Sequence, residues 1–209
     1  MKINEIFYSI QGESTFAGLP CTLIRTTGCH LRCAWCDTAY AFYEGKELSL
    51  EEIIQQVESI GCRLVEITGG EPLLQEESLV LMARLLDKGF KVLLETSGGV
   101  DVGAVDSRVK MIMDVKCPGS GMSDRMIWKN LNRLKETDEI KFVIANRQDY
   151  DWAKETLEEY HPSQEILFSP VFGEQDPQSL AEWILKDRLP VRFQLQMHKH
   201  IWSPQARGV

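Results

Sequence analysis

Short apolar runs alternate with longer amphipathic segments along this chain from about residue 20 onward. Each run is short and bounded by a turn or helix signal, as is typical of buried strands. The pattern predicts strands at residues 22–26, 64–68, 91–96, 110–115, 139–144, 165–169 and 191–195. Apolar residues at helical spacing predict helices at residues 50–60, 76–88, 124–134, 148–160 and 178–186. Capping signals support several of these boundaries, among them Ser49 with Glu52, Gly89 and Pro177.

Strands that alternate with helices indicate parallel pairing through right-handed crossovers. The chain has 209 residues, fewer than the roughly 250 of a complete eight-unit barrel. We therefore predict an α/β fold and a single domain over residues 1–209. That domain is an incomplete (βα) barrel of about six parallel strands with an N-terminal extension. Functional residues are expected at the carboxyl ends of the strands, where the loops of such folds converge on one crevice.

Composition and charge exclude several classes of function. The 23 basic and 31 acidic residues give a net charge of -8, without the basic stripe that binding to a phosphate backbone requires. No apolar run approaches the roughly 18 residues of a bilayer span, and the first residues lack the basic-then-apolar order of a signal peptide. We therefore expect a cytoplasmic protein that binds neither nucleic acid nor membrane.

Six cysteines in a chain expected in the cytoplasm favour metal binding or catalysis over disulfides. Cys29, Cys33 and Cys36 follow the spacing C-x3-C-x2-C directly after the first predicted strand. Three thiolates can hold an iron–sulfur cluster with one unligated iron, whereas a closed structural zinc site needs four ligands. A zinc site completed by His30 or Cys21, or three unrelated thiols, are the alternatives. The remaining cysteines stand singly and are not assigned to the cluster: Cys21, Cys62 and Cys117.

A second motif, TGGEP at residues 68–72, follows the second predicted strand. Two adjacent glycines let the backbone approach a ligand closely, and the proline stiffens the exit from the turn. The next two predicted strands also end in polar segments, at residues 95–98 and 114–118. Polar sequences thus follow four consecutive strands, as expected for a crevice at that edge of the sheet.

The cysteine loop, with Trp35 before its last cysteine, and the glycine-rich segment together resemble the radical S-adenosylmethionine (SAM) superfamily. The resemblance implies a 4Fe-4S cluster on Cys29, Cys33 and Cys36, with SAM bound at the unligated iron. It also implies an enzyme whose radical is carried by the cofactor, so that no protein side chain is needed as a catalytic residue. The residues expected to bind the cofactor are Trp35, Asp37, Gly69, Gly70, Glu71, Ser97 and Lys116.

Further motifs narrow the resemblance. IQGES at residues 10–14, Arg25, CHLRCAWCDT at residues 29–38, TGGEP and a late QMHK at residues 196–199 together resemble the 7-carboxy-7-deazaguanine synthase family. This implies a lyase that rearranges 6-carboxy-5,6,7,8-tetrahydropterin into 7-carboxy-7-deazaguanine with loss of ammonia, on the route to queuosine. Two alternatives are retained. One is a glycyl-radical enzyme activase, which uses the same cysteine spacing, and the other is a non-catalytic zinc or iron–sulfur binding module.

The same resemblance implies roles for single residues. Thr38 would give its hydroxyl to Mg2+, and Arg25 would meet the substrate carboxylate through its planar fork of donors. His198 is the expected ligand-binding residue of the tail, and Val209 follows it by eleven positions, farther than the chain end of relatives. The residues expected to bind substrate are Gln11, Gly12, Glu13, Arg25, Thr68, His198 and Val209.

The partners expected from the resemblance are a small-molecule pterin substrate and an electron donor of the flavodoxin or ferredoxin type. A homodimer is also expected, because relatives of this size pair and because an incomplete barrel leaves a strand edge exposed.

Overall fold

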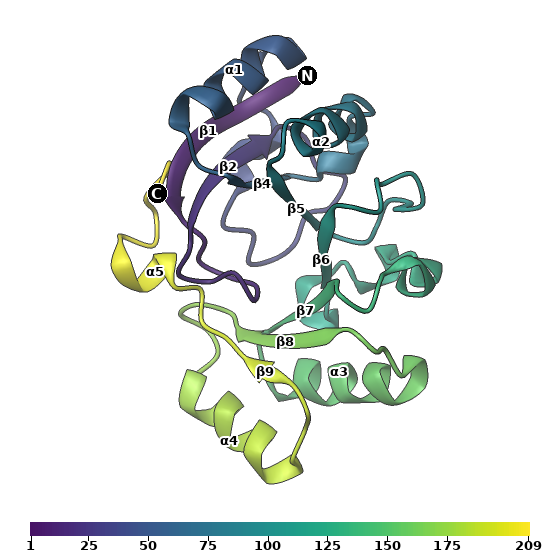
Figure 1. Cartoon of the computed structure of the whole chain (residues 1–209). Coiled ribbons are helices and arrows are strands. Elements are labelled where there is room, and N and C mark those ends of the chain that lie inside the picture. Colours follow the sequence, from purple (N-terminus) through teal and green to yellow (C-terminus); the bar gives the residue numbers. More distant parts are fainter.

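The computed structural model describes all 209 residues and contains one curved nine-stranded sheet with helices on its outer side (Figure 1). The strand order is β3-β1-β2-β4-β5-β6-β7-β8-β9, so the sheet keeps two free edges and does not close. Neighbouring strands from β2 to β9 are parallel, whereas β1 is antiparallel to both β2 and β3. The strands are β1 (Lys2–Ile10), β2 (Pro20–Thr26), β3 (Lys46–Glu47), β4 (Leu64–Gly69), β5 (Lys91–Thr96), β6 (Lys110–Val115), β7 (Glu139–Ile144), β8 (Glu165–Pro170) and β9 (Arg192–Phe193).

The predicted partial barrel of parallel strands is confirmed. Six of its strands are long, and the seventh, predicted at residues 191–195, is only the two-residue β9. The N-terminal extension is itself a strand, β1, which pairs with β2 from Ile3 to Ile10. The sequence did not reveal β1 because polar Glu5 and Ser9 share one side of the strand with Phe7. Neither side of the strand is uniformly apolar, so the alternation that marks a half-buried strand is absent.

Four of the five predicted helices are present, each within one residue of its predicted ends. Ser49 and Glu52 form the predicted capping box at the start of α1, and Asp176 caps α4 just before Pro177. No helix is long and apolar enough to cross a lipid bilayer. The α-helices are α1 (Leu50–Ile60), α2 (Glu77–Asp87), α3 (Arg147–Tyr160), α4 (Pro177–Asp187) and α5 (His198–Ile201).

The prediction of a helix at residues 124–134 is wrong. Two short 3-10 helices occupy this region, at Ser123–Arg125 and Trp128–Arg133. Asn130 explains the departure, because its side chain is fully buried and serves the loop after β5. Its amide donates to the carbonyls of Gly98 and Val100 at 3.0 and 2.7 Å, and its side-chain oxygen accepts from the backbone N–H of Val102. These tertiary contacts outweigh the local helical pattern.

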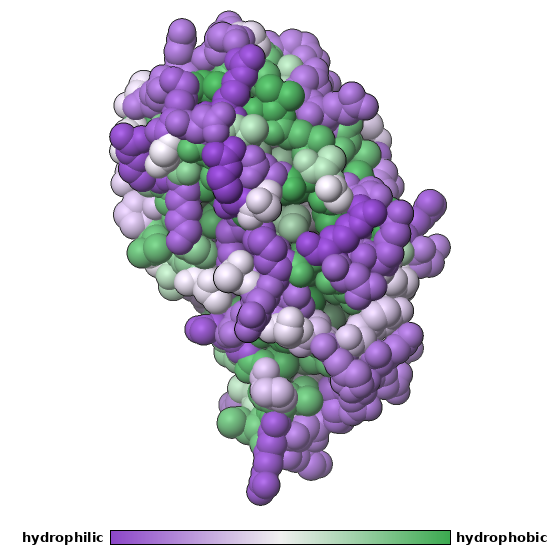
Figure 2. Space-filling model, turned by 45° about the vertical axis from the view of Figure 1, so that its right-hand side comes forward, coloured by the Kyte–Doolittle hydropathy of each residue, from purple (hydrophilic) through white to green (hydrophobic).

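The sheet separates two apolar clusters. The larger one, of 30 buried residues, packs the sheet against its outer helices. Side chains alternate between the two faces of a strand. Those on the inner face of the sheet form a smaller cluster at the base of the barrel. Its members are Cys21, Leu23, Leu64, Leu93 and Ile112. Figure 2 shows a face on which hydrophilic residues predominate, in keeping with this collection of apolar side chains inside.

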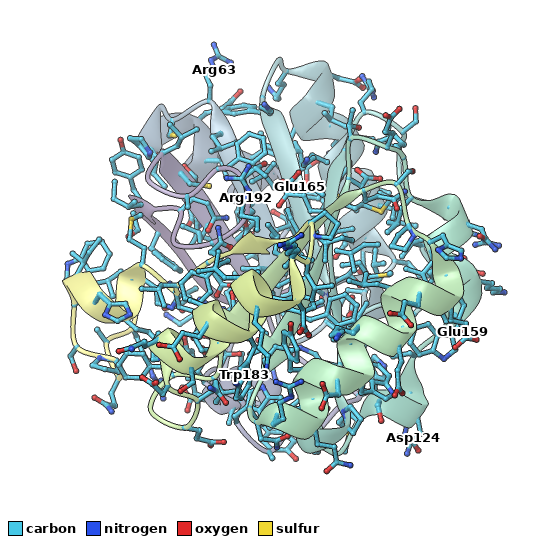
Figure 3. All side chains as sticks on the ribbon, turned by 90° about the horizontal axis from the view of Figure 1, so that it is seen from below. Arg63, Asp124, Glu159, Glu165, Trp183 and Arg192 are labelled. Carbon is cyan, nitrogen blue, oxygen red and sulfur yellow. The ribbon has the colours of Figure 1, made fainter.

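Chain segments, rather than a strand pair, span the open side of the barrel. The loop at residues 11–19, between β1 and β2, folds inward, and the segment leading into α5 runs beside it (Figure 1). The backbone N–H of Met197 donates to the carbonyl of Gly12 at 2.9 Å. Seen from below, Arg192 lies beside Glu165 at the start of β8, and the two form an ion pair of 2.8 Å (Figure 3).

Candidate active site

A cavity of about 680 Å³ opens at the carboxyl ends of the parallel strands. Residues of the strand ends, the cysteine loop, the loop at residues 11–19 and the C-terminal segment line it. This is the position that the strand–helix alternation predicted. Every predicted site residue except Glu71 lines the cavity: Gln11, Gly12, Glu13, Arg25, Cys29, Cys33, Trp35, Cys36, Asp37, Thr38, Thr68, Gly69, Gly70, Ser97, Lys116, His198 and Val209.

The cysteine loop, residues 27–38, has no regular secondary structure and is shaped by hydrogen bonds. The backbone N–H of Ala34 donates to the carbonyl of Ser120 at 3.0 Å, and that of Cys36 donates to the carbonyl of Cys33 at 3.2 Å. Arg32 donates from its guanidinium to the carbonyl of Cys29 at 2.8 Å. The three half-buried thiols therefore face the cavity from a loop that is held in place at several points.

The glycine-rich segment locks onto the cysteine loop through close backbone contacts. The N–H of Glu71 donates to the carbonyl of Gly28 at 2.8 Å, and the N–H of Gly70 donates to the carbonyl of Thr26 at 3.2 Å. A Cβ at Gly70 would overlap the Gly28 carbonyl and lie 3.0 Å from the Cβ of Cys29. Gly69 has a φ of 135°, which few other residues adopt. Only glycines let these two loops approach so closely.

Glu71 is the exception among the predicted cofactor-binding residues, because its side chain is fully buried outside the cavity lining. Its carboxylate accepts hydrogen bonds from the hydroxyls of Thr96 and Ser97 and from the backbone N–H groups of Ser97 and Leu73. Glu71 thus ties the end of β4 to the end of β5. These bonds position the cavity wall, and the role of Glu71 in binding the cofactor stays a prediction.

The donor set on the cysteine loop fits an iron–sulfur cluster better than a single metal ion. No three Cys, His, Asp or Glu side chains come close enough together to hold one ion. A cluster instead takes one thiolate at each of several irons, so its three cysteines need not converge on a point. Burial raises the pKa of Cys29 and of Cys33, so binding to iron releases protons from these thiols.

The other cysteines do not join this loop. All six cysteines are free, and Cys21 and Cys117 are buried. Burial raises the pKa of the thiols of Cys21 and Cys117, which therefore stay protonated. Cys62 is partly exposed and donates to the carbonyl of Pro20 at 3.3 Å. None of these three residues lines the cavity.

Charged side chains form the floor of the cavity around Lys141, which projects inward from the middle of β7 and is only 3% exposed. Its ammonium pairs with Glu13 at 2.6 Å, with Glu95, and with Asp114 at 3.4 Å. Lys116 pairs with the same Asp114 oxygen at 2.9 Å. Buried charges are tolerated only when paired, and each of these groups has a partner of opposite sign.

Two carboxyl groups in this floor are pushed toward opposite protonation states. Burial raises the pKa of Glu66 well above its usual range, and the nearby Glu95 and Glu13 raise it further. Burial would also raise the pKa of Glu95, but the Lys141 ammonium and the Thr68 hydroxyl lower it to about 2. Glu66 therefore holds its proton to higher pH than an ordinary glutamate, whereas Glu95 is ionised at neutral pH.

Arg25 extends from β2 into the cavity lining, and its guanidinium is fixed by a hydrogen bond on the side away from the cavity. Its Nε donates to Glu5 at 2.8 Å, and the same Glu5 oxygen accepts from the hydroxyl of Tyr40 at 2.9 Å. No other hydrogen bond of the guanidinium is present, so its terminal nitrogens remain for a ligand. A guanidinium fixed in this way is suited to bind a carboxylate in two-point fashion.

Thr38 lines the cavity just after the last cysteine, and its hydroxyl makes only a weak contact of 3.8 Å with the sulfur of Cys36. Asp37 beside it is paired with Lys199 at 2.7 Å. Burial would raise the pKa of Asp37, but Lys199 lowers it. A hard oxygen donor without a strong partner fits Mg2+, which binds few protein ligands and keeps several waters.

The C-terminal segment covers one side of the cavity. Burial lowers the pKa of His198, so its imidazole is neutral at neutral pH. Arg207 lies 3.8 Å above the ring of Tyr40 and pairs with Glu44 at 2.8 Å, which fastens the last residues across the opening. Val209, in the same segment, also lines the cavity.

Sequence reasoning missed several of the residues that form the cavity floor and rim. Glu95 and Asp114 stood in the noted polar strand ends but received no role, whereas Glu66 and Lys141 lie inside strands, with no local motif. The one available signal was a charged residue at an inward position of an otherwise apolar strand. The missed residues that the structure brings to the site are Glu66, Glu95, Asp114, Lys141, Lys199 and Arg207.

Comparisons with known proteins agree with this geometry. The family model of the radical SAM superfamily matches residues 23–184. The chain is 47% identical over 214 residues to 7-carboxy-7-deazaguanine synthase of Chlorobaculum tepidum, covering 100% of this chain and 97% of that protein. It is 46% identical over 226 residues to the enzyme of that name from Koribacter versatilis, with 100% of both chains covered.

The fold agrees as well. The crystal structure of QueE from Escherichia coli superposes with a TM-score of 0.79 at 26% sequence identity, covering 94% of each chain. These likenesses favour the enzyme family over a glycyl-radical activase and over a non-catalytic metal-binding module. The chain belongs to the 7-carboxy-7-deazaguanine synthase family of the radical SAM superfamily.

Proposed function

We propose that this protein converts 6-carboxy-5,6,7,8-tetrahydropterin into 7-carboxy-7-deazaguanine with loss of ammonia, as a carbon–nitrogen lyase of the route to queuosine. The observation that carries the proposal is one cavity in which the cysteine loop and a charged floor face each other. The first is suited to a 4Fe-4S cluster with SAM, and the second to a small polar heterocycle.

When bound, the cluster and SAM would supply one-electron radical chemistry at the substrate. Cys29, Cys33 and Cys36 hold the cluster. Trp35, Asp37, Ser97, Lys116 and the backbone at Gly69 and Gly70 are assigned to SAM. Thr38 is assigned to Mg2+, which would orient the substrate.

The residues of this chain then bind and orient the substrate. Glu13 and Gln11 face the amide and amino edge of the pterin, where a carboxylate and an amide offer complementary partners. Arg25 takes the substrate carboxylate with the terminal nitrogens that Glu5 leaves unused. Neutral His198 stands beside Gly12 and contributes an uncharged imidazole to the same end of the site. Thr68 and Val209 complete the substrate wall.

The same residues exclude water from the reacting atoms. The C-terminal segment, fastened by Arg207, and the loop at residues 11–19 bound the cavity on its open side. Exclusion of water and stray hydrogen donors protects a reactive primary radical. No protein nucleophile is needed, because the cofactor carries the radical.

We assign the whole chain, residues 1–209, to one catalytic domain that acts in the cytoplasm as a homodimer. A flavodoxin or ferredoxin would supply the electron. Six free cysteines are in keeping with a reducing compartment, and the free β9 edge is in keeping with pairing of two copies.

The test is incubation of anaerobically reconstituted protein with SAM, dithionite, Mg2+ and 6-carboxy-5,6,7,8-tetrahydropterin. Mass spectrometry should detect 7-carboxy-7-deazaguanine and one ammonia per product. SAM cleavage without this product would overturn the assigned substrate. Absence of both cleavage and the brown colour of the cluster would overturn the cluster assignment as well.

A further inference from the structure

Ser14 has a left-handed backbone conformation, with a φ of 63°, at the inner end of the substrate-facing segment. A residue other than glycine is strained in this conformation, so surrounding contacts must hold it there. Ser14 is also only 2% exposed, and its backbone groups therefore need partners inside the protein.

The side chain of Gln194 provides those partners. Its amide oxygen accepts from the N–H of Ser14 at 2.7 Å, and its amide nitrogen donates to the carbonyl of Ser14 at 2.6 Å. Gln194 is 8% exposed, and its own N–H donates to the carbonyl of Phe168 in β8 at 2.9 Å. The Gln194 side chain thus ties the strained turn to the far edge of the open sheet, while the N–H of the adjacent Thr15 donates to Glu139 of β7 at 3.0 Å.

Two further contacts continue this connection toward the cavity. The N–H of Met197 donates to the carbonyl of Gly12, and the side-chain amide of Gln196 donates to Glu13 Oε1 at 2.8 Å. Lys141 binds the other oxygen, Glu13 Oε2, at 2.6 Å. Both oxygens of the Glu13 carboxylate therefore have fixed positions, and the direction of its side chain depends on the turn at Ser14.

We propose that Gln194 is a positioning residue that holds the segment at residues 11–14 in its binding conformation across the open side of the barrel. Gln194 does not line the cavity, so it acts through Ser14 and Glu13 rather than by touching a ligand. The inference rests on the proposed function, in which this segment recognises the pterin edge. A preformed segment binds substrate without the entropy cost of ordering a loop.

The test compares Gln194→Leu with the wild-type holoenzyme. The variant should raise the KM for 6-carboxy-5,6,7,8-tetrahydropterin about tenfold and change kcat less than about twofold. SAM cleavage driven by dithionite without the pterin, and the iron content, should stay at wild-type values. Hydrogen exchange followed by mass spectrometry should be faster in the peptide that contains Ser14.

A double variant probes the mechanism directly. Glycine adopts left-handed φ values freely. The double variant Ser14→Gly/Gln194→Leu should therefore have a KM at least about threefold lower than that of Gln194→Leu alone. Gln175→Leu is the matched control: Gln175 is also 8% exposed and bonded to a backbone carbonyl, but lies outside the cavity lining. It should keep the wild-type KM.

Three outcomes overturn the proposal: an unchanged KM in Gln194→Leu, a loss confined to kcat, or no recovery in the double variant. If Gln194→Leu does not fold, Gln194→Glu carries the same test, since it keeps an acceptor for the Ser14 N–H but loses the donor. Failure of the wild-type enzyme to form the deazaguanine acid would count against the proposed function instead.

Discussion

The two halves of the cavity are built in different ways. The cofactor half consists of two contiguous loops, the cysteine loop and the glycine-rich segment, held mainly by backbone hydrogen bonds. The substrate half consists of single side chains from separate strands, with Lys141 of β7 pairing with Glu13 of the first loop and Glu95 of β5. Spacing along the chain thus defines the first half, and only folding assembles the second.

The largest effect is expected from removing one ligand of the cofactor half. Cys29→Ala, Cys33→Ala or Cys36→Ala should each lower SAM cleavage by at least about 1,000-fold, because no other thiol lines the cavity to replace it. Iron content, absorption near 400 nm and methionine release measure the effect. Cys62→Ala is the control and should keep full cleavage, since Cys62 lies outside the cavity. Cleavage by any of the three cavity variants would contradict the cluster assignment.

A second effect should fall on the substrate half alone. Lys141→Met leaves Glu13, Glu95 and Asp114 without their shared cation, so product formation should fall about 100-fold or more. The free energy of unfolding should drop by roughly 3–5 kcal/mol, the usual cost of breaking a buried ion pair. SAM cleavage without substrate should persist, because Lys141 touches no cysteine of the loop.

Lys129→Met serves as its control. Lys129 is 62% exposed and pairs with Asp101 at 3.3 Å on the surface, where such pairs contribute little. It should change the free energy of unfolding by less than about 0.5 kcal/mol. Equal losses in both variants, or loss of SAM cleavage in a folded Lys141→Met protein, would show that the halves are not separable.

The difference between the halves explains what the sequence could predict. The alternation of apolar runs and amphipathic segments predicted four α-helices and the parallel strands correctly, because each element has its own periodic pattern of apolar residues. The cysteine and glycine motifs could be recognised in the sequence because the residues of each motif lie within a few positions of one another. The resemblance to a known family placed the remaining site residues at the same cavity, apart from Glu71.

The misses have physical causes as well. The pattern at residues 124–134 is helical, yet Asn130 is used to bind a distant loop, which no local pattern reveals. Lys141 and Glu66 sit at inward strand positions that are apolar in an ordinary core. These buried polar groups are stable there only because residues of other strands and of the loop at residues 11–19 pair with them. Pairing over such sequence distances cannot be read from one chain without its fold.

A smaller effect should come from the support behind Arg25. Glu5→Gln removes the charge that holds Arg25 Nε and should raise the KM for the pterin about tenfold, with kcat nearly unchanged. Glu165→Gln is the control, because it weakens an ion pair of the same 2.8 Å length at the opposite end of the barrel. A KM change in the control, or none in Glu5→Gln, would contradict this role for Glu5.

The smallest effect concerns the pH dependence of stability at Glu66. Its pKa is raised in the folded state, mainly by burial, so the folded protein keeps a proton that the unfolded chain loses above its ordinary pKa of 4.5. The stability of the wild-type protein therefore falls as pH rises from that value toward the folded pKa. The amide introduced by Glu66→Gln cannot ionise but still accepts a hydrogen bond from Gln11, so the variant should escape this loss.

The unfolding free energy of Glu66→Gln relative to wild type should therefore increase between pH 5 and pH 8. The increase measures how far the folded-state pKa of Glu66 lies above its ordinary value. Urea unfolding at the two pH values measures the change, with Glu58→Gln, in an exposed pair with Lys88, as the control. A difference between Glu66→Gln and wild type that stays constant with pH would mean that Glu66 is ionised in the folded floor. The substrate half would then carry one more negative charge than the geometry indicates.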